Sequence, residues 1–209
     1  MENFNQKTHW QRIYQHKTNT DVSWYQAKPK VSLSFFEKFN IPKNAKIIDI
    51  GGGDSLLVDN LLALGYTDIT VLDISEISLQ KAQQRLGSLA NNVKWIVADV
   101  ANFYPSQQYD FWHDRATFHF LTQNIDVQKY VRTISQHIEP LGVLVVGTFS
   151  DKGPKKCSGI EVKQYSKKSL VTTIGQYFKK ETCLTHRHKT PFDTVQSFVF
   201  CSFTKVPLV

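Results

Sequence analysis

The sequence predicts an α/β fold, in which a seven-stranded, mainly parallel sheet has its last strand antiparallel and carries helices on both faces. Three observations lead to this prediction. Short apolar segments alternate with amphipathic segments from residue 46 to the end of the chain. Neither a low-complexity linker nor an internal repeat interrupts them. The length of 209 residues allows one well-buried core and is too short for two comfortable domains, so we expect a single domain.

Seven segments have the apolar, β-branched and aromatic residues that are typical of strands. They are Ile47–Ile50, Ile69–Asp73, Val93–Asp99, Tyr109–His113, Val143–Phe149, Thr182–Arg187 and Val195–Phe203. Only residues 188–194, with Pro191 among them, connect the last two segments. Because so short a connection cannot hold a crossover helix, these two strands are predicted to pair as an antiparallel hairpin.

The segments between the strands have the spacing of helices. Residues 56–64 place leucines on one face, and residues 127–138 do the same with valine, isoleucine and tyrosine. Ser75 stands where a helix N-cap is expected, and Gly87 stands where that helix should end. Strands that alternate with such helices favour a parallel sheet that is covered on both faces.

Residues 1–45 lie outside this alternation and gather aromatic side chains in otherwise polar sequence. The aromatic positions are His9, Trp10, Tyr14, Trp24 and Tyr25. A helix packed on the sheet explains part of this pattern. A lid over the mouth of a ligand site explains it better, because aromatic walls exclude water and enclose a ligand. We therefore expect residues 1–45 to form an N-terminal helical and aromatic lid segment.

The net charge of +7 is unevenly distributed. Residues 1–150 hold 14 basic and 14 acidic side chains, so residues 151–209, with 11 basic and 4 acidic side chains, carry the whole excess. A solvated helix face is one explanation, and a dock for an acidic acceptor, a nucleic acid or a protein surface is the other. Lysines dominate there and the aromatic residues look like core residues, so no stacking platform for nucleic acid is indicated.

Cysteine usage and hydropathy indicate a cytoplasmic protein without a membrane segment. No run approaches the ~18 apolar residues of a membrane-spanning helix, and the first residues do not resemble a secretory signal. The three cysteines, Cys157, Cys183 and Cys201, are odd in number and widely spaced, without a CxxC pair. We therefore expect neither a disulfide framework nor a zinc site, and no other metal site is indicated.

A glycine turn follows the first predicted strand and is the strongest functional signal. Ile47–Ile50, with Asp49 near its end, leads into Gly51–Gly53, which lets backbone N–H groups approach a ligand closely. Asp73 ends the next strand, 24 residues after Asp49, where an acid holds the hydroxyl pair of a ribose. Together these features predict a nucleoside cofactor.

Three details indicate which cofactor this is. The dinucleotide pattern G-x-G-x-x-G/A fails at its third position, which is Leu56. Asp49 would repel a pyrophosphate, whereas an amino group and a sulfonium would tolerate or favour it. The chain also has no second domain for a dehydrogenase substrate. S-adenosyl-L-methionine (SAM), with S-adenosyl-L-homocysteine as its product, fits all three details.

From about Trp10 onward the chain resembles the class I SAM-dependent methyltransferases. The matching elements are Asp49 with Gly51–Gly53, Asp73, Ala98–Val100, Asp110–Arg115 and Pro140–Gly142. Ser55 departs from the pattern, since many members have a third glycine there. The resemblance implies a Rossmann-like seven-stranded sheet and makes residues 46–209 the SAM-binding methyltransferase domain.

Cofactor contacts follow from the resemblance position by position. It implies that Asp49, Gly51, Gly52 and Gly53 face the methionine end of SAM. It also implies that Asp73 holds the ribose hydroxyls, that Ile74 packs on the adenine, that Asp99 accepts the adenine amino group and that Val100 adds a backbone contact. We expect Trp24 and Tyr25 of the lid segment to complete the cofactor site.

The acceptor side should lie after the fourth strand, in residues 112–120. Asp114 is a candidate to orient or deprotonate an acceptor amine, or to pair with Arg115, and His119 is a candidate general base. The sequence Asp114–Phe118 resembles both thiol or thiopurine S-methyltransferases and elongation-factor lysine methyltransferases. An Asn/Asp-Pro-Pro-aromatic motif, which DNA adenine methylases carry here, is missing.

The resulting prediction is a SAM-dependent methyltransferase that moves a methyl group to a nucleophilic nitrogen or sulfur. A small-molecule thiol or amine leads slightly over a protein lysine as the acceptor. The remaining alternatives are a SAM-binding module without catalysis and, more distantly, an NAD-linked oxidoreductase.

Overall fold

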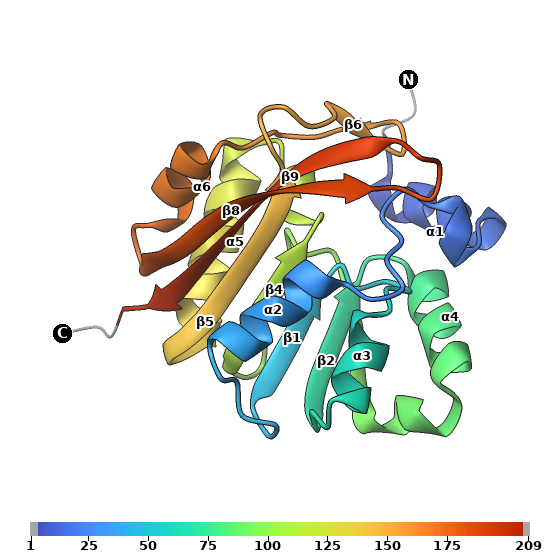
Figure 1. The fold of residues 1–209 in the computed structure, drawn as a ribbon, viewed down its shortest axis with the longest axis horizontal. Helices are drawn as coiled ribbons and strands as arrows, with labels where there is room; N and C mark the ends of the chain where they lie inside the picture. Colours follow the sequence, from blue (N-terminus) through green and yellow to red (C-terminus); the bar gives the residue numbers. More distant parts are fainter. Residues whose placement is uncertain (1–3, 207–209) are drawn as a thin grey trace.

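Seven strands of the computed structural model, which describes residues 4–206, form one sheet in the order β3-β2-β1-β4-β5-β9-β8 (Figure 1). The strands are β1 (Lys46–Ile50), β2 (Asp68–Asp73), β3 (Val93–Val97), β4 (Tyr109–Arg115), β5 (Ile138–Phe149), β8 (Phe178–Lys189) and β9 (Val195–Lys205). Neighbours from β3 through β5 pair in parallel, and β9 runs antiparallel to both β5 and β8. The predicted fold class and the predicted terminal hairpin are therefore confirmed.

Six α-helices accompany the sheet in the described part of the chain. They are α1 (Gln6–His16), α2 (Lys30–Lys38), α3 (Leu57–Ala63), α4 (Glu76–Leu86), α5 (Asn124–His137) and α6 (Lys167–Ile174). Three short 3₁₀ helices, η1 (Asn19–Asp21), η2 (Gly87–Asn92) and η3 (Phe118–Phe120), supplement them. The Ser75 side chain caps α4 by accepting from Ser78 N, and Gly87 ends the helix, as the sequence predicts.

Alternate residues of each strand build two separate cores, one on each face of the sheet. Ile47 and Phe111 point to the core that contains α2 and α3, which lie in front of the sheet in Figure 1. Ile48 and Trp112 point to the opposite core, which contains α5 and α6. Because of this two-residue period, neighbouring side chains in β4 point to opposite faces of the sheet. The same alternation sets the directions of the side chains that follow Trp112.

The N-terminal segment is fastened to the carboxyl end of the sheet through α4. The side-chain oxygen of Gln11 in α1 accepts hydrogen bonds from the Ser75 hydroxyl (3.0 Å) and from Ile77 N (3.1 Å). Lys81 of α4 donates to the carbonyl oxygen of Lys17 at 2.7 Å. Figure 1 shows α1 beside α4 as a result. The predicted N-terminal helix is thus present, and it packs at the end of the strands where ligands bind in such sheets.

Two features of the C-terminal third differ from the prediction or were missed by it. Cys183 and Cys201 form a disulfide, so the expectation that the cysteines make no disulfide is wrong for this pair. The β8–β9 register places the two residues directly opposite each other, with their Cα atoms 4.1 Å apart, which spacing along the sequence does not reveal. A small hairpin of β6 (Lys156–Cys157) and β7 (Ile160–Glu161) was also not predicted.

Two general features concern residues 4–206. None of their helices has the length and apolar character needed to cross a bilayer. Within the same residues, no cluster of three or more His, Cys, Asp or Glu side chains has the arrangement of a metal site.

Candidate functional site

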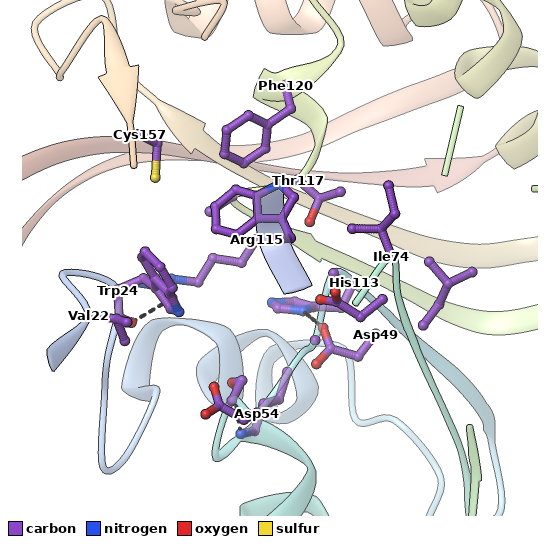
Figure 2. A pocket seen from close by; sticks show the side chains of 18 of the residues that line it. Val22, Trp24, Asp49, Asp54, Ile74, His113, Arg115, Thr117, Phe120 and Cys157 are labelled. Carbon is purple, nitrogen blue, oxygen red and sulfur yellow. Dashed lines mark hydrogen bonds and ion pairs between the residues drawn. The ribbon is translucent and has the colours of Figure 1, made fainter. Parts of the chain in front are cut away.

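A cavity lies at the carboxyl ends of the parallel strands, where the segments after β1, β2, β3 and β4 meet. Most of the predicted site residues line it, namely Trp24, Tyr25, Asp49, Gly51, Gly52, Asp73, Ile74, Asp99, Val100 and Arg115. The remaining predictions, Gly53, Asp114 and His119, are not among the residues that line the cavity. Figure 2 shows Asp49 and Ile74 on one side of the site and Cys157 and Phe120 on another.

The glycine turn forms a backbone surface that side chains cannot occupy. Gly51 has a φ of +63°, and a Cβ there would lie 1.7 Å from Thr117 Oγ1. Gly53 has a φ of +50°, and a Cβ there would lie 2.8 Å from the Tyr14 hydroxyl. Only glycine fits such positions without strain. The turn is therefore a cradle whose surface is made of backbone atoms. Gly53 does not line the cavity itself, but its missing side chain allows Tyr14 to approach the turn.

Three buried carboxylates surround this turn. Burial, together with the negative charges of Asp54 and Asp49, raises the pKa of Asp73 to about 7, against the hydrogen bond that Asp73 accepts from Ser75 N at 2.8 Å. Burial also raises the pKa of Asp54, while the charge of Arg85 opposes it. A group of acids disfavours phosphate and favours hydroxyl donors or a cation. Asp54 belongs to this group although the sequence analysis did not select it.

Asp49 is held in place by a chain of two hydrogen bonds that reaches α2. Its Oδ1 lies 2.7 Å from His113 Nδ1 (Figure 2), and His113 Nε2 lies 2.9 Å from the Ser32 hydroxyl. With Asp49 ionised, Nδ1 donates to the carboxylate, so a neutral His113 accepts from Ser32 through Nε2. All three side chains are buried. His113 and Ser32 are positioning residues that the sequence analysis missed.

The segment after β3 supplies a further acid, Asp99, which is partly exposed. Asp99 Oδ1 accepts from Ala101 N at 2.9 Å, and its Oδ2 accepts from the Asn102 amide at 3.2 Å. Each oxygen keeps a lone pair for a further donor. Ala98 N donates to the carbonyl oxygen of Asp73 at 3.0 Å, which joins this segment to the end of β2. Asp73 and Asp99 thus lie along one side of the cavity, with Ile74 between them in the sequence.

Aromatic side chains from the N-terminal segment form another wall. The ring centroid of Trp10 lies 5.8 Å from that of Trp24 and 5.3 Å from that of Phe120. Tyr14 packs edge-on against Trp24 and also lines the cavity. Burial raises the pKa of Tyr14 well above its ordinary value, so its hydroxyl stays protonated. The predicted aromatic segment is therefore part of the cavity wall, and the closing motion of a lid stays a prediction.

Asp114 points away from the cavity because it follows His113 in an alternating strand. Its Oδ1 accepts from Thr117 N (3.1 Å) and Phe118 N (3.0 Å), and its Oδ2 accepts from the Tyr130 hydroxyl (2.8 Å). Burial raises its pKa to about 6 against these hydrogen bonds. The carboxylate therefore organises the turn after β4. The expectations that it handles the acceptor or pairs with Arg115 receive no support from this geometry.

His119 is likewise directed into the protein interior. Its Nδ1 accepts from Phe149 N at 3.3 Å, and its ring packs against that of Phe149 at 4.6 Å. Burial, followed by the charge of Arg115, lowers the pKa of His119 to about 3. A base that weak and that enclosed is poorly suited to collect a proton from a substrate. His119 is therefore not assigned the role of general base.

Arg115 shares the cavity face with His113, two residues before it in β4. Its guanidinium lies near Cys157 and over the ring of Phe198, and Phe149 also lines the cavity. Burial raises the pKa of the Cys157 thiol to about 11, so this cysteine is a wall residue rather than a reactive thiolate. This part of the cavity combines one cation with an apolar and aromatic lining.

The residues present fit a SAM-like nucleoside. The glycine cradle and Asp49 suit an amino-acid end with a positive charge, Asp73 suits a ribose diol, and Asp99 suits an adenine amino group. Among the residues that line the cavity beside the turn, none is a cation that could bind a pyrophosphate. The apolar part near Phe149 and Phe198 is left for a second molecule.

Comparison with known proteins independently relates the chain to methyltransferases. Residues 47–142 match the family described as methyltransferase domain. Over 147 residues, 69% of this chain, it is 27% identical to the eEF1A lysine and N-terminal methyltransferase of Mus musculus, of which it covers 20%. It is 24% identical to EEF1A lysine methyltransferase 2 of Homo sapiens, covering 67% of this chain and 66% of that protein. The chain therefore spans less than two thirds of these relatives.

Bacterial relatives and solved structures add methyltransferases of other kinds to the proteins that this chain resembles. The chain is 26% identical to malonyl-[acyl-carrier protein] O-methyltransferase 1 of Ilyobacter polytropus over 53% of this chain and 40% of that protein. The N-methyltransferase NodS of Bradyrhizobium japonicum, solved with S-adenosyl-L-homocysteine, superposes with a TM-score of 0.70 at 12% identity and covers 93% of this chain and 97% of that one. A protein from a study of echinomycin biosynthesis gives a TM-score of 0.76 at 16% identity, covering 96% and 93%.

The close approach at Gly51 predicts a loss of cofactor binding when a methyl group is added there. Gly51→Ala should weaken the binding of S-adenosyl-L-homocysteine at least ~10-fold, because its Cβ must displace Thr117 from the wall of the cradle. Gly65→Ala is the matched control, since Gly65 also has a positive φ but open space around it. Isothermal titration calorimetry measures both, and unchanged affinity in Gly51→Ala would contradict the assignment.

The raised pKa of Asp73 predicts that cofactor affinity depends on pH. A ribose diol donates to the ionised carboxylate, so binding should strengthen as pH rises toward the pKa of about 7 and level off above it. Below that pKa the affinity should change at most about tenfold per pH unit. Calorimetry with S-adenosyl-L-homocysteine from about pH 6 to about pH 8 measures the dependence. Asp73→Asn should remove this dependence of affinity on pH. An affinity of the unmodified protein that does not change with pH would contradict the prediction.

Proposed function

The chain belongs to the class I SAM-dependent methyltransferases, and from this premise we propose that it methylates a nucleophilic nitrogen or sulfur of a small-molecule acceptor. One observation carries the proposal. A continuous cavity joins the acids that suit a nucleoside, Asp73 and Asp99, to an apolar chamber beside Phe149 and Phe198. A donor and a small acceptor can therefore lie in one enclosed space.

When bound, SAM supplies a methyl group on a sulfonium: the acceptor lone pair bonds to the methyl carbon, the sulfur–methyl bond breaks with its electron pair kept by sulfur, and the acceptor proton passes to water. The protein contributes proximity, alignment and exclusion of bulk water. Asp49, fixed by His113 and Ser32, would hold the amino-acid end of the cofactor, and Asp73 would hold its ribose. Trp10, Trp24 and Phe120 shield the reacting centre.

The acid–base candidates in and around the acceptor chamber are not free to accept a proton. Asp114 and His119, the acid–base candidates from the sequence, are engaged in the interior, and the Cys157 thiol stays protonated. This favours acceptors that reach the cavity with an available lone pair, such as a thiolate or a weakly basic amine. Placement of the nucleophile then supplies most of the catalytic effect.

A protein lysine is the second candidate acceptor. Two relatives named as eEF1A lysine methyltransferases favour it, and the basic residues after residue 150 offer a dock for an acidic protein surface. Against it, the Arg115 guanidinium would repel an incoming ammonium, and the carboxylates of Asp49 and Asp114 are already hydrogen-bonded, to His113 and to Tyr130. A SAM-binding module without catalysis is the remaining alternative.

Transfer of a labelled methyl group identifies the acceptor class. The full chain is incubated with methyl-labelled SAM and a cell extract that is separated afterwards into small-molecule and protein fractions. Label should enter the small-molecule fraction, and Gly51→Ala should abolish its incorporation.

Other outcomes separate the alternatives. Label on protein lysines would replace the small-molecule proposal, and charge reversal at Lys155, Lys156, Lys167 and Lys168 should then reduce it. Binding of S-adenosyl-L-homocysteine without any labelled product would indicate the non-catalytic module.

A further inference from the structure

Arg115 places a half-buried cation on the far side of the cavity from the nucleoside acids. Its side chain runs from the end of β4 toward Trp24, whose carbonyl oxygen accepts from Nη1 at 3.1 Å (Figure 2). The guanidinium carbon lies 5.2 Å from the ring centroid of Phe198 in β9, two strands beyond β4 in the sheet. Asp73 and Asp99 follow β2 and β3, on the other side of β1. The guanidinium therefore belongs to the acceptor half of the cavity.

This guanidinium has an unused donor and makes no ion pair with a carboxylate among the described residues. Nη2 is buried and has no hydrogen-bond partner among the described residues. The nearby acid Asp49, whose charge acts on Arg115, is already hydrogen-bonded to His113. Burial lowers the pKa of Arg115 to about 10, so the side chain remains charged at neutral pH. A buried charge without a partner is unfavourable, and an anion that enters the cavity relieves this.

None of the other described groups around Arg115 neutralises its charge. Burial keeps the Cys157 thiol protonated, as described above. His119 is neutral, and the pKa values of His186 and His188 are lowered by burial and by the charge of Arg115. The surroundings of the guanidinium are thus neutral or apolar. A planar guanidinium with a free N–H is the geometric match for a carboxylate.

We propose that Nη2 of Arg115 binds a carboxylate of the methyl acceptor, which makes the acceptor an anionic small molecule. This inference rests on the proposed methyltransferase function and names its substrate class. The rings of Trp24, Phe120, Phe149 and Phe198 also line the cavity. The acceptor therefore joins its carboxylate to an apolar or aromatic body that carries the reactive nitrogen or sulfur. The same charge excludes a free lysine ammonium.

Matched pairs of ligands test the carboxylate preference without turnover. Benzoate, phenylacetate and 3-phenylpropionate are each titrated against the neutral amide of the same skeleton, into the full chain saturated with S-adenosyl-L-homocysteine. At least one carboxylate should bind ~10-fold more tightly than its amide. Arg115→Met should remove the preference. Arg187→Met, which removes the same charge from an exposed position on β8, should retain it. Absence of a preference in all three pairs would overturn the proposal.

A second comparison identifies whose carboxylate Arg115 binds. S-adenosyl-L-homocysteine carries an amino-acid carboxylate, and 5′-methylthioadenosine lacks it. If the acceptor is the partner, Arg115→Met should change the affinity of both by less than ~3-fold. A loss of ~10-fold or more for S-adenosyl-L-homocysteine alone would assign the carboxylate to the cofactor and overturn the proposal. Failure of the unmodified chain to bind either nucleoside would instead overturn the proposed function, and this inference with it.

Discussion

The close packing of the Gly51–Gly53 turn is the constraint on which the rest of the site depends. Gly52 N donates to the carbonyl oxygen of Leu72 at 3.1 Å, and the Thr117 hydroxyl donates to that of Ile50 at 3.2 Å. These two bonds tie the ends of β1, β2 and β4 together around a turn that has no side chains. Because Thr117 and Tyr14 occupy the space that Cβ atoms would take, the cradle, the acids and the N-terminal wall keep fixed relative positions. A binding site made of segments from distant parts of the sequence becomes one preorganised surface.

The cavity that results is electrostatically divided. Three buried acids surround the glycine turn, and burial and mutual repulsion raise the pKa of Asp73 to about 7. The opposite half contains one guanidinium among aromatic rings and neutral histidines. Clustered acids in one half and a cation without an ion-pair partner in the other make the free protein less stable. Such a loss of stability is typical of a binding site. A donor with a positive centre and an acceptor with a negative group would each complete one half.

The sequence predicted the sheet, its reversed strand and most of the residues that line the cavity beside the glycine turn, because these depend on local signals. Apolar period, glycine turns and acids at strand ends are visible in a single chain. The sequence did not predict which side chains after β4 face the cavity, since Asp114 and Arg115 are neighbours and strand alternation sends only one of them into it. His119 follows in a short 3₁₀ helix whose direction depends on packing against Phe149. The role of His113 and the Cys183–Cys201 disulfide depend on tertiary pairings, which spacing along the chain does not encode.

A crystal structure of the full chain with S-adenosyl-L-homocysteine tests this division of the cavity most directly. The account predicts the adenine amino group at Asp99, the ribose hydroxyls at Asp73, and the sulfur at the border of the chamber formed by Phe149 and Phe198. Nη2 of Arg115 should remain free of the cofactor. A nucleoside bound in the aromatic chamber, or a cofactor carboxylate paired with Arg115, would contradict the assignment of the two halves.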